Sequence, residues 1–178
     1  MKLKNILWAF ALLSIVSCSS SDDGTEPKPT PTPTPPPVVE SNLQKHAEDD
    51  EIKVMSFNIR LNTSDDMNNA WPFRQEACIE LIKDHKPTVI GFQEAKYLDQ
   101  WLVLLSSLSD GYDGWGVDRD NGAENPKNGE TMGILYDKKK VKKIDGGTFW
   151  LSTTPDEVSK SWDSACNRTA TWGIFEHI

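Results

Sequence analysis

Runs of apolar residues, spaced by polar ones, predict two strands around a helix in the first half of the folded region. Residues 52–58 and 88–93 are rich in Val, Ile and Phe, which is typical of buried strands. Between them, Arg74 to His85 places apolar residues at helical spacing. Pro72 suits a helix start and Pro87 ends the helix. The pattern predicts a β-α-β unit.

Beyond this unit the pattern shifts toward strands. A second amphipathic helix is expected from Leu98 to Leu108, ended by the glycines at 111, 114 and 116. Polar residues at 118–129 predict a long loop, and 152–167 is irregular. Strands are expected at 132–136, 141–144, 148–151 and 169–175, with Gly146-Gly147 as a turn between the middle two. Helices first and strands later predict an α+β fold in which packed sheets carry helices outside.

The N-terminus has the features of a secretory signal. Lys2 and Lys4 precede an apolar run, residues 6–13, and small residues follow. We therefore expect a signal peptide at 1–17. The apolar run is too short to span a bilayer, which disfavours the alternative, an uncleaved membrane anchor.

Ile15-Val16-Ser17-Cys18 resembles a bacterial lipobox, which implies a lipid on Cys18. Multiple acyl chains hold a protein stably on a membrane. The resemblance implies a cell-envelope protein, anchored in the outer membrane and exposed at the surface. Prolines crowd residues 27–37, which predicts a stiff polyproline II spacer. We expect three regions: 1–17, a lipidated linker at 18–50, and one domain at 51–178.

Charge and cysteine usage exclude several kinds of site. The chain has a formal net charge of −8, so a basic face for nucleic acid is not expected. Its basic cluster, Lys138-Lys139-Lys140 with Lys142 and Lys143, predicts a solvated hairpin. Cys78 falls on the apolar helix face and is expected to be a buried free thiol; a disulfide to Cys166 has no positive support. The histidines lack zinc-ligand spacing.

Two predicted strands end in oxygen ligands. The first ends at Asn58, and the second, Val89 to Gln93, is followed by Glu94. Amide and carboxylate oxygens suit hard cations, so these two residues predict half of a metal site. The alternative is a strand-end carboxylate that faces water, and spacing alone favours it.

An ordered series of motifs resembles the endonuclease/exonuclease/phosphatase superfamily. The series comprises the strand Val54 to Arg60, the strand Ile90 to Glu94, Gly129-Glu130, Met132 to Tyr136, Phe149 to Ser152, Trp162-Asp163 and Arg168 to Trp172. It covers essentially all of Ile52 to Phe175, and its later pieces resemble a secreted bacterial branch. The resemblance implies the N-terminal portion of a four-layer α/β/β/α sandwich with two packed mixed β-sheets.

The resemblance also implies roles at the site. Glu94 would be the principal ligand of Mg²⁺ (or Mn²⁺), and Asn58 would orient the metal shell or the phosphate. Arg168 would bind substrate phosphate, with a surface salt bridge as the alternative. Glu130 would support the substrate site, with a loop-end charge as the alternative.

Other matching residues are expected to pack and not to react. Trp71 and Arg74 suit packing at a helix start. Trp115 and Trp162 would line a cleft or pack in a core or rim, and aromatic packing is the commoner role.

The family's later motifs are absent from the printed sequence. They are a Thr-His-Leu-Asp-type strand, a Gly-Asp-Phe-Asn-type strand and a terminal Asp-His pair, which supply phosphate-binding and base groups. We therefore expect a truncated domain, incomplete or inactive as given. The leading function is a metal-dependent phosphoester hydrolase acting on small phosphoesters or lipid headgroups in preference to nucleic acid. The alternative is a noncatalytic surface lipoprotein that binds glycan or another ligand.

Overall fold

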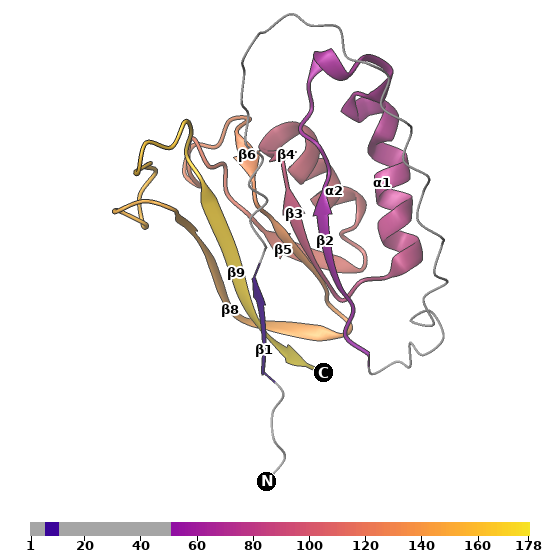
Figure 1. Ribbon diagram of the computed structural model, residues 1–178. Coiled ribbons are helices and arrows are strands. Elements are labelled where there is room, and N and C mark those ends of the chain that lie inside the picture. Colours follow the sequence, from indigo (N-terminus) through magenta and orange to yellow (C-terminus); the bar gives the residue numbers. More distant parts are fainter. Residues whose placement is uncertain (1–5, 11–50) are drawn as a thin grey trace, which may run out of the picture. The chain divides into compact units, whose positions relative to one another are not determined.

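The computed structural model describes residues 6–10 and 51–178 (Figure 1). The predicted lipidation site Cys18, its linker and most of the predicted signal peptide lie outside the described residues. Within the described part, no helix is both long enough and apolar enough to cross a membrane.

Four strands form the first sheet, in the order β2-β3-β7-β5. β2 and β3 run parallel, as a β-α-β unit requires, and the other two pairs are antiparallel. The bounds are β2 Val54–Asn58, β3 Val89–Gln93, β5 Tyr112–Trp115 and β7 Ile134–Asp137. β2 and β3 confirm the strands predicted at residues 52–58 and 88–93.

Helices connect the strands of this sheet. A short 3₁₀ segment, Ser64–Asn69, precedes α1 (Trp71–His85). Pro72 lies in the first turn of α1, where its missing N–H costs nothing, and left-handed Lys86 ends the helix. The second expected helix starts as a π-helical turn, Tyr97–Trp101, and continues as α2 (Leu102–Ser107). Both expected helices are therefore present.

A second sheet, in the order β1-β9-β8, is antiparallel throughout. It contains β1 Ile6–Phe10, β8 Val141–Trp150 and β9 Thr169–His177. A two-stranded ribbon pairs β4 (Ala95–Lys96) with β6 (Glu130–Thr131). This ribbon brings the segment after β3 beside the end of the long polar loop.

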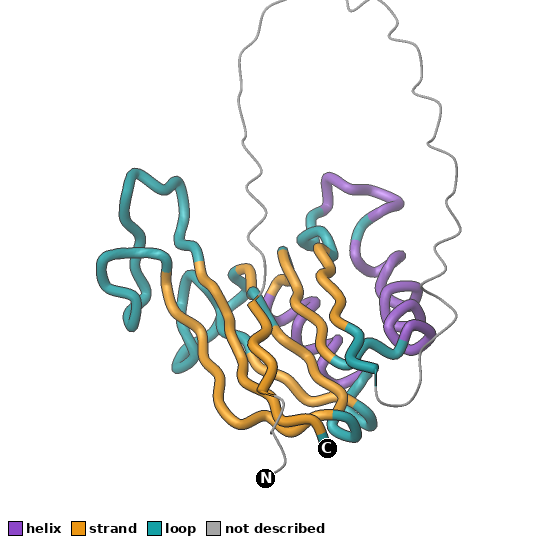
Figure 2. Tube along the Cα trace, turned by 60° about the horizontal axis from the view of Figure 1, so that its bottom comes forward, coloured by secondary structure: helices purple, strands orange, loops and turns teal. Residues whose placement is uncertain are grey.

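Side-chain alternation in the first sheet builds two cores. Ile90, Phe92 and Leu135 pack with α1 and α2, while Val89 and Ile134 pack with β8 and β9 of the second sheet. Figure 2 shows the helices on one side of the strands. Helix layer, mixed sheet and second sheet match the predicted α+β sandwich.

The predicted Gly146-Gly147 turn is wrong. β8 runs through both glycines and pairs with β9 along its whole length, with a bulge between Lys143 and Asp145. A Cβ on Gly146 would lie 2.7 Å from the Trp115 ring and 2.9 Å from the Trp172 carbonyl oxygen. Gly146 therefore serves close packing here, which a sequence pattern cannot separate from a turn.

Two further expectations need correction. Lys138–Lys140 form the turn between β7 and β8, which belong to different sheets, so the lysine cluster is not a hairpin within one sheet. The glycine-rich segment after α2 does end the helix, but it also forms β5, which the sequence pattern did not predict. Pairing with β7 supplies the hydrogen bonds that make this short polar segment a strand.

Candidate functional site at the ends of β2 and β3

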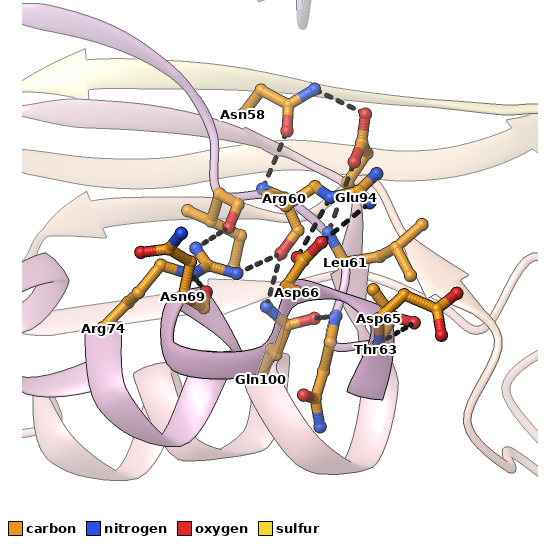
Figure 3. A network of polar contacts seen from close by, with 12 residues as sticks. Asn58, Arg60, Leu61, Thr63, Asp65, Asp66, Asn69, Arg74, Glu94 and Gln100 are labelled. Carbon is orange, nitrogen blue, oxygen red and sulfur yellow. Dashed lines mark hydrogen bonds and ion pairs between the residues drawn. The ribbon is translucent and has the colours of Figure 1, made fainter.

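Asn58 and Glu94 meet where β2 and β3 end. Asn58 Nδ2 donates a 2.8 Å hydrogen bond to Glu94 Oε1 (Figure 3). The other carboxylate oxygen, Oε2, accepts from the Leu61 backbone N–H at 3.3 Å, and Asn58 Oδ1 accepts from the Arg60 N–H at 2.9 Å. Parallel pairing of the two strands places both ends at one sheet edge, so the predicted pair forms.

The backbone at this edge is strained. Glu94 has φ 61° and Arg60 has φ 58°, a region that bulky L-residues rarely adopt. Such conformations cost about 1–3 kcal/mol each and persist only where the surrounding structure holds them. They are enriched at functional sites, which makes this edge a candidate independently of the carboxylate.

Gln100 holds the strained segment in place. Its Nε2 donates to the Arg60 carbonyl at 2.9 Å, and its Oε1 accepts from the N–H groups of Asn62 and Lys96 at 2.8 and 3.0 Å. The side chain is fully buried. One amide therefore ties the segment after β2 to the segment after β3, which sets the position of Glu94.

Arg74 holds the same segment from α1. Its guanidinium donates to the carbonyls of Asn69, Ile59 and Arg60, and its carbon Cζ lies 5.7 Å from the Trp71 ring centroid. All of its guanidinium nitrogens bind backbone oxygens, which fits the packing role expected at the helix start.

Arg60 brings an exposed positive charge to the site. Its guanidinium pairs with Asp66 through two hydrogen bonds of 3.1 and 3.2 Å, and its side chain is 55% exposed. The Asp66 hydrogen bond raises the pKa of Arg60, and nearby Glu94 raises it further. The same hydrogen bond lowers the pKa of Asp66 below its ordinary value. A permanent cation beside Glu94 suits contact with a phosphate.

Glu130 lies in the ribbon that follows Glu94, and its carboxylate faces Arg119. It pairs across the ribbon with Lys96. Arg119 Nη1 lies 2.9 Å from Glu130 Oε2, in an ion pair whose angles are not those of a hydrogen bond. Both side chains are largely buried, at 11% and 14% exposure. Glu130 is thus placed to support the edge, and its predicted substrate contact stays a prediction.

Three other residues singled out from the sequence have no described contact with Asn58 or Glu94: Arg168, Trp115 and Trp162. Arg168 is exposed just before β9, and none of the described hydrogen bonds or ion pairs joins its side chain to Asn58 or Glu94. Trp115 packs between the sheets against Phe175 with ring centroids 5.9 Å apart, so core packing is its role. Trp162 is 72% exposed.

The loop before β6 is built around Asp118. This fully buried carboxylate accepts hydrogen bonds from the backbone N–H groups of Asp120, Asn121, Lys127 and Gly129, and from the Asn121 side chain. Burial alone would raise the pKa of Asp118, but these hydrogen bonds lower it below its ordinary value. The carboxylate therefore acts as the template on which the loop folds.

Asn128 at the end of this loop joins it to the site. Its Oδ1 accepts from the Leu98 and Asp99 N–H groups, and its Nδ2 donates to Asp99 Oδ2 at 2.8 Å. The same Asp99 oxygen accepts from Asn62 Nδ2 at 3.1 Å, and Asn62 follows β2. Three separate segments are thus linked around the strand ends.

The oxygen atoms at this edge fit the ligand preference of a Mg²⁺ or Mn²⁺ ion. The described residues contain no group of three or more His, Cys, Asp or Glu side chains that could hold a metal. Mg²⁺ does not need such a group, because it binds one or two carboxylates and keeps several waters. Each Glu94 oxygen carries one hydrogen bond in the structure, and a carboxylate oxygen can accept two. Glu94 therefore keeps capacity for a cation, while Asn58 orients its carboxylate.

Sequence reasoning missed three residues of this arrangement. Arg60 lies two residues after Asn58, a spacing that could have drawn attention to it. Gln100 and Arg119 carry no such signal, because their roles come from contacts with residues 40 and 11 positions away in the chain.

The described residues include two cysteines. Cys78 and Cys166 are both free thiols, and Cys78 is less buried than the sequence pattern predicted. Cys78 is half-buried, and this burial raises the pKa of its thiol.

Comparison with known proteins gives matches among solved structures. No family model and no curated protein matches the chain. The endonuclease/exonuclease/phosphatase from Bacteroides vulgatus is 38% identical, with a TM-score of 0.64 over 70% of this chain. An endonuclease/exonuclease/phosphatase family protein from Bacteroides thetaiotaomicron is 34% identical with a TM-score of 0.64 over 71%. A mannosyl-6-phosphatase from the same species is 33% identical with a TM-score of 0.62 over 70%.

The match covers most of this chain and part of each neighbour. This chain spans 46%, 45% and 46% of the lengths of those three proteins, in the same order. All three proteins are more than 30% identical to this chain and share its fold over about 70% of its length. The chain belongs to the endonuclease/exonuclease/phosphatase family.

Proposed function

We propose that this chain carries the metal-binding part of a phosphoester hydrolase site, with small phosphoesters as substrates. The observation that carries the proposal is the Asn58–Glu94 hydrogen bond of 2.8 Å at the open ends of β2 and β3. Family membership supports the reaction class. Similarity to a mannosyl-6-phosphatase supports a sugar phosphate as the substrate.

Glu94 would hold Mg²⁺ or Mn²⁺ through its carboxylate, and Asn58 would keep that carboxylate oriented. When bound, the cation would polarise a phosphoryl oxygen and offset the charge that develops in attack by water. Arg60 supplies an exposed cation near Glu94 for the phosphate, and Arg168 and Glu130 remain proposed substrate-site residues by resemblance.

Electrostatics favour a small substrate or a lipid headgroup over a long polyanion. The chain's net charge of −8 repels nucleic acid, whereas one or two arginines suffice for a single phosphate. We also propose a lipid anchor at Cys18 that holds the protein on the outer membrane, facing the cell exterior. The lipobox-like sequence supports this placement.

The test measures metal binding and turnover separately. Mn²⁺ binding by the full chain is followed by electron spin resonance, with Glu94→Gln as the variant and exposed Glu124→Gln as the matched control. We expect Glu94→Gln to weaken binding at least about 10-fold and the control to leave it unchanged, since Glu94 is the principal protein ligand. Mn²⁺ binding that survives Glu94→Gln would contradict the proposed site.

A measurement of substrate turnover distinguishes a phosphoester hydrolase from the alternative, a noncatalytic binding lipoprotein. Phosphate release from mannose 6-phosphate, glycerol phosphate and a phosphodiester is followed with Mg²⁺ and with a chelator. A hydrolase predicts Mg²⁺-dependent release that disappears in Glu94→Gln. Release that is insensitive to both the chelator and the substitution would exclude catalysis at this edge.

A further inference from the structure

The segment between β8 and β9, residues 151–168, projects from the end of the fold where β2 and β3 terminate (Figures 1 and 2). Hydrogen bonds connect its base to the site. Trp150 Nε1 and Asn167 Nδ2 both donate to the Arg119 carbonyl, at 2.7 and 3.3 Å. Arg119 in turn pairs with Glu130 in the ribbon beside Glu94. The segment is therefore anchored to the site's own framework.

Hydroxyl groups within the segment fix its conformation. Ser152 Oγ lies 2.6 Å from Ser159 Oγ, which also bonds to the Thr154 side chain and carbonyl. Ser161 Oγ accepts a hydrogen bond from the Thr153 N–H at 3.1 Å and lies 3.2 Å from the Thr153 hydroxyl oxygen. A loop held by this many internal bonds presents its remaining side chains at small entropic cost on binding.

The tip of this segment holds an exposed aromatic ring in a strained backbone. Trp162 and Asp163 have φ of 55° and 56°, and Trp162 is 72% exposed. Among described non-glycine residues, the others with positive φ include Arg60 and Glu94 at the site. Two consecutive strained residues are costly, and such strain concentrates at ligand-binding positions.

The chemistry around the ring fits a carbohydrate. Residues 160–165 line an open hollow, and Lys160, Trp162 and Asp163 are among them. Among the described residues, neither charged group has an ion-pair partner. A sugar ring offers an apolar C–H face for the indole, whose π-face is electronegative, and hydroxyl groups for a donor and an acceptor.

We propose that Trp162 is a carbohydrate-stacking platform on the segment whose base is bonded to Arg119, and that it holds a sugar unit of a phosphorylated glycan. This inference rests on the proposed function, which assigns the phosphate group of the substrate to the site at Glu94. It adds that Trp162 binds a sugar ring of the same substrate. Lys160 and Asp163 bind the hydroxyl groups of the stacked sugar. The unphosphorylated sugar unit alone is sufficient to occupy the platform.

The test uses the full chain labelled with 5-fluorotryptophan. The chain has seven tryptophans, and Trp162→Phe assigns the ¹⁹F resonance of Trp162. Hexoses, hexose disaccharides and mannose 6-phosphate are titrated in, with glycerol 3-phosphate as the ligand without a sugar ring. We expect a saturable shift of the Trp162 resonance with the sugars and none with glycerol 3-phosphate.

Substitution controls complete the test. Trp162→Ala is expected to weaken sugar binding about 3- to 10-fold, as loss of one aromatic stacking contact implies. Phe73→Ala removes an equally exposed ring, also 72% exposed, from α1 and is expected to change nothing. The proposal would be wrong if sugars do not shift the Trp162 resonance, or if Trp162→Ala and Phe73→Ala change sugar affinity equally.

Failure of the proposed function gives a different result. If Glu94 binds no metal and supports no turnover, the ¹⁹F shift by unphosphorylated sugar still reports the platform. If the shift is absent while Glu94-dependent turnover is present, the platform is wrong and the hydrolase stands.

Discussion

Asp118→Asn tests whether a single buried carboxylate holds the loop before β6. The two Asp118 oxygens accept five hydrogen bonds, with donor–acceptor distances of 2.8 to 3.1 Å. Asparagine keeps the shape but replaces one oxygen with an NH₂ group. If Oδ1 stays in place, this NH₂ faces three donors, the N–H groups of Lys127 and Gly129 and the Nδ2 of Asn121, so all three lose their acceptor.

The three lost charge-assisted hydrogen bonds set the upper bound of the effect. Each is worth about 1.5–3 kcal/mol, and relaxation of the loop recovers part of this. We expect the free energy of unfolding to fall by about 2–4 kcal/mol, measured by urea denaturation at pH 7. Glu124→Gln, an exposed change in the same loop, should stay within about 0.5 kcal/mol of the wild type.

The pH dependence of this difference has a defined sign. Because the folded-state pKa of Asp118 is lowered from 3.8, its contribution is present above the unfolded-state pKa and is lost as pH falls through the folded-state value. The gap between wild type and Asp118→Asn should therefore shrink below pH 3.8. A gap that is absent at pH 7, or that persists unchanged at the lowest pH with folded protein, would refute the reasoning.

Three further predictions follow from local contacts. Gly133→Ala should lower stability by about 1–3 kcal/mol, since its Cβ would lie 2.3 Å from the buried Trp101 ring; an unchanged melting temperature would contradict this. Arg60→Gln should raise the pKa of Asp66 toward 3.8 in an NMR titration, because the ion pair keeps it low; the pair's stabilisation is lost as pH falls through that low value. Cys78 should react slowly with a thiol reagent at pH 8 and rapidly in urea, because burial raises its pKa; equal rates would disprove protection by the fold.

Much of the fold follows from local patterns. The strands around α1 were predictable because buried parallel strands are continuously apolar, and because Pro72 and Pro87 bracket the helix. β5 and the unbroken β8 were not predictable, because both depend on partners elsewhere in the chain. β5 is a strand through its pairing with β7, and β8 through its pairing with β9.

The sequence by itself determined which chemical groups end the strands: the Asn58 amide and the Glu94 carboxylate. Residue type and strand periodicity are local properties, so no tertiary information was needed for them. Only the tertiary structure decided that Asn58 donates to Glu94 and that Gln100 pins the backbone beside them. These contacts join residues 36 and 40 positions apart, and such long-range partners are chosen by how the sheet and helices pack, which local patterns do not encode.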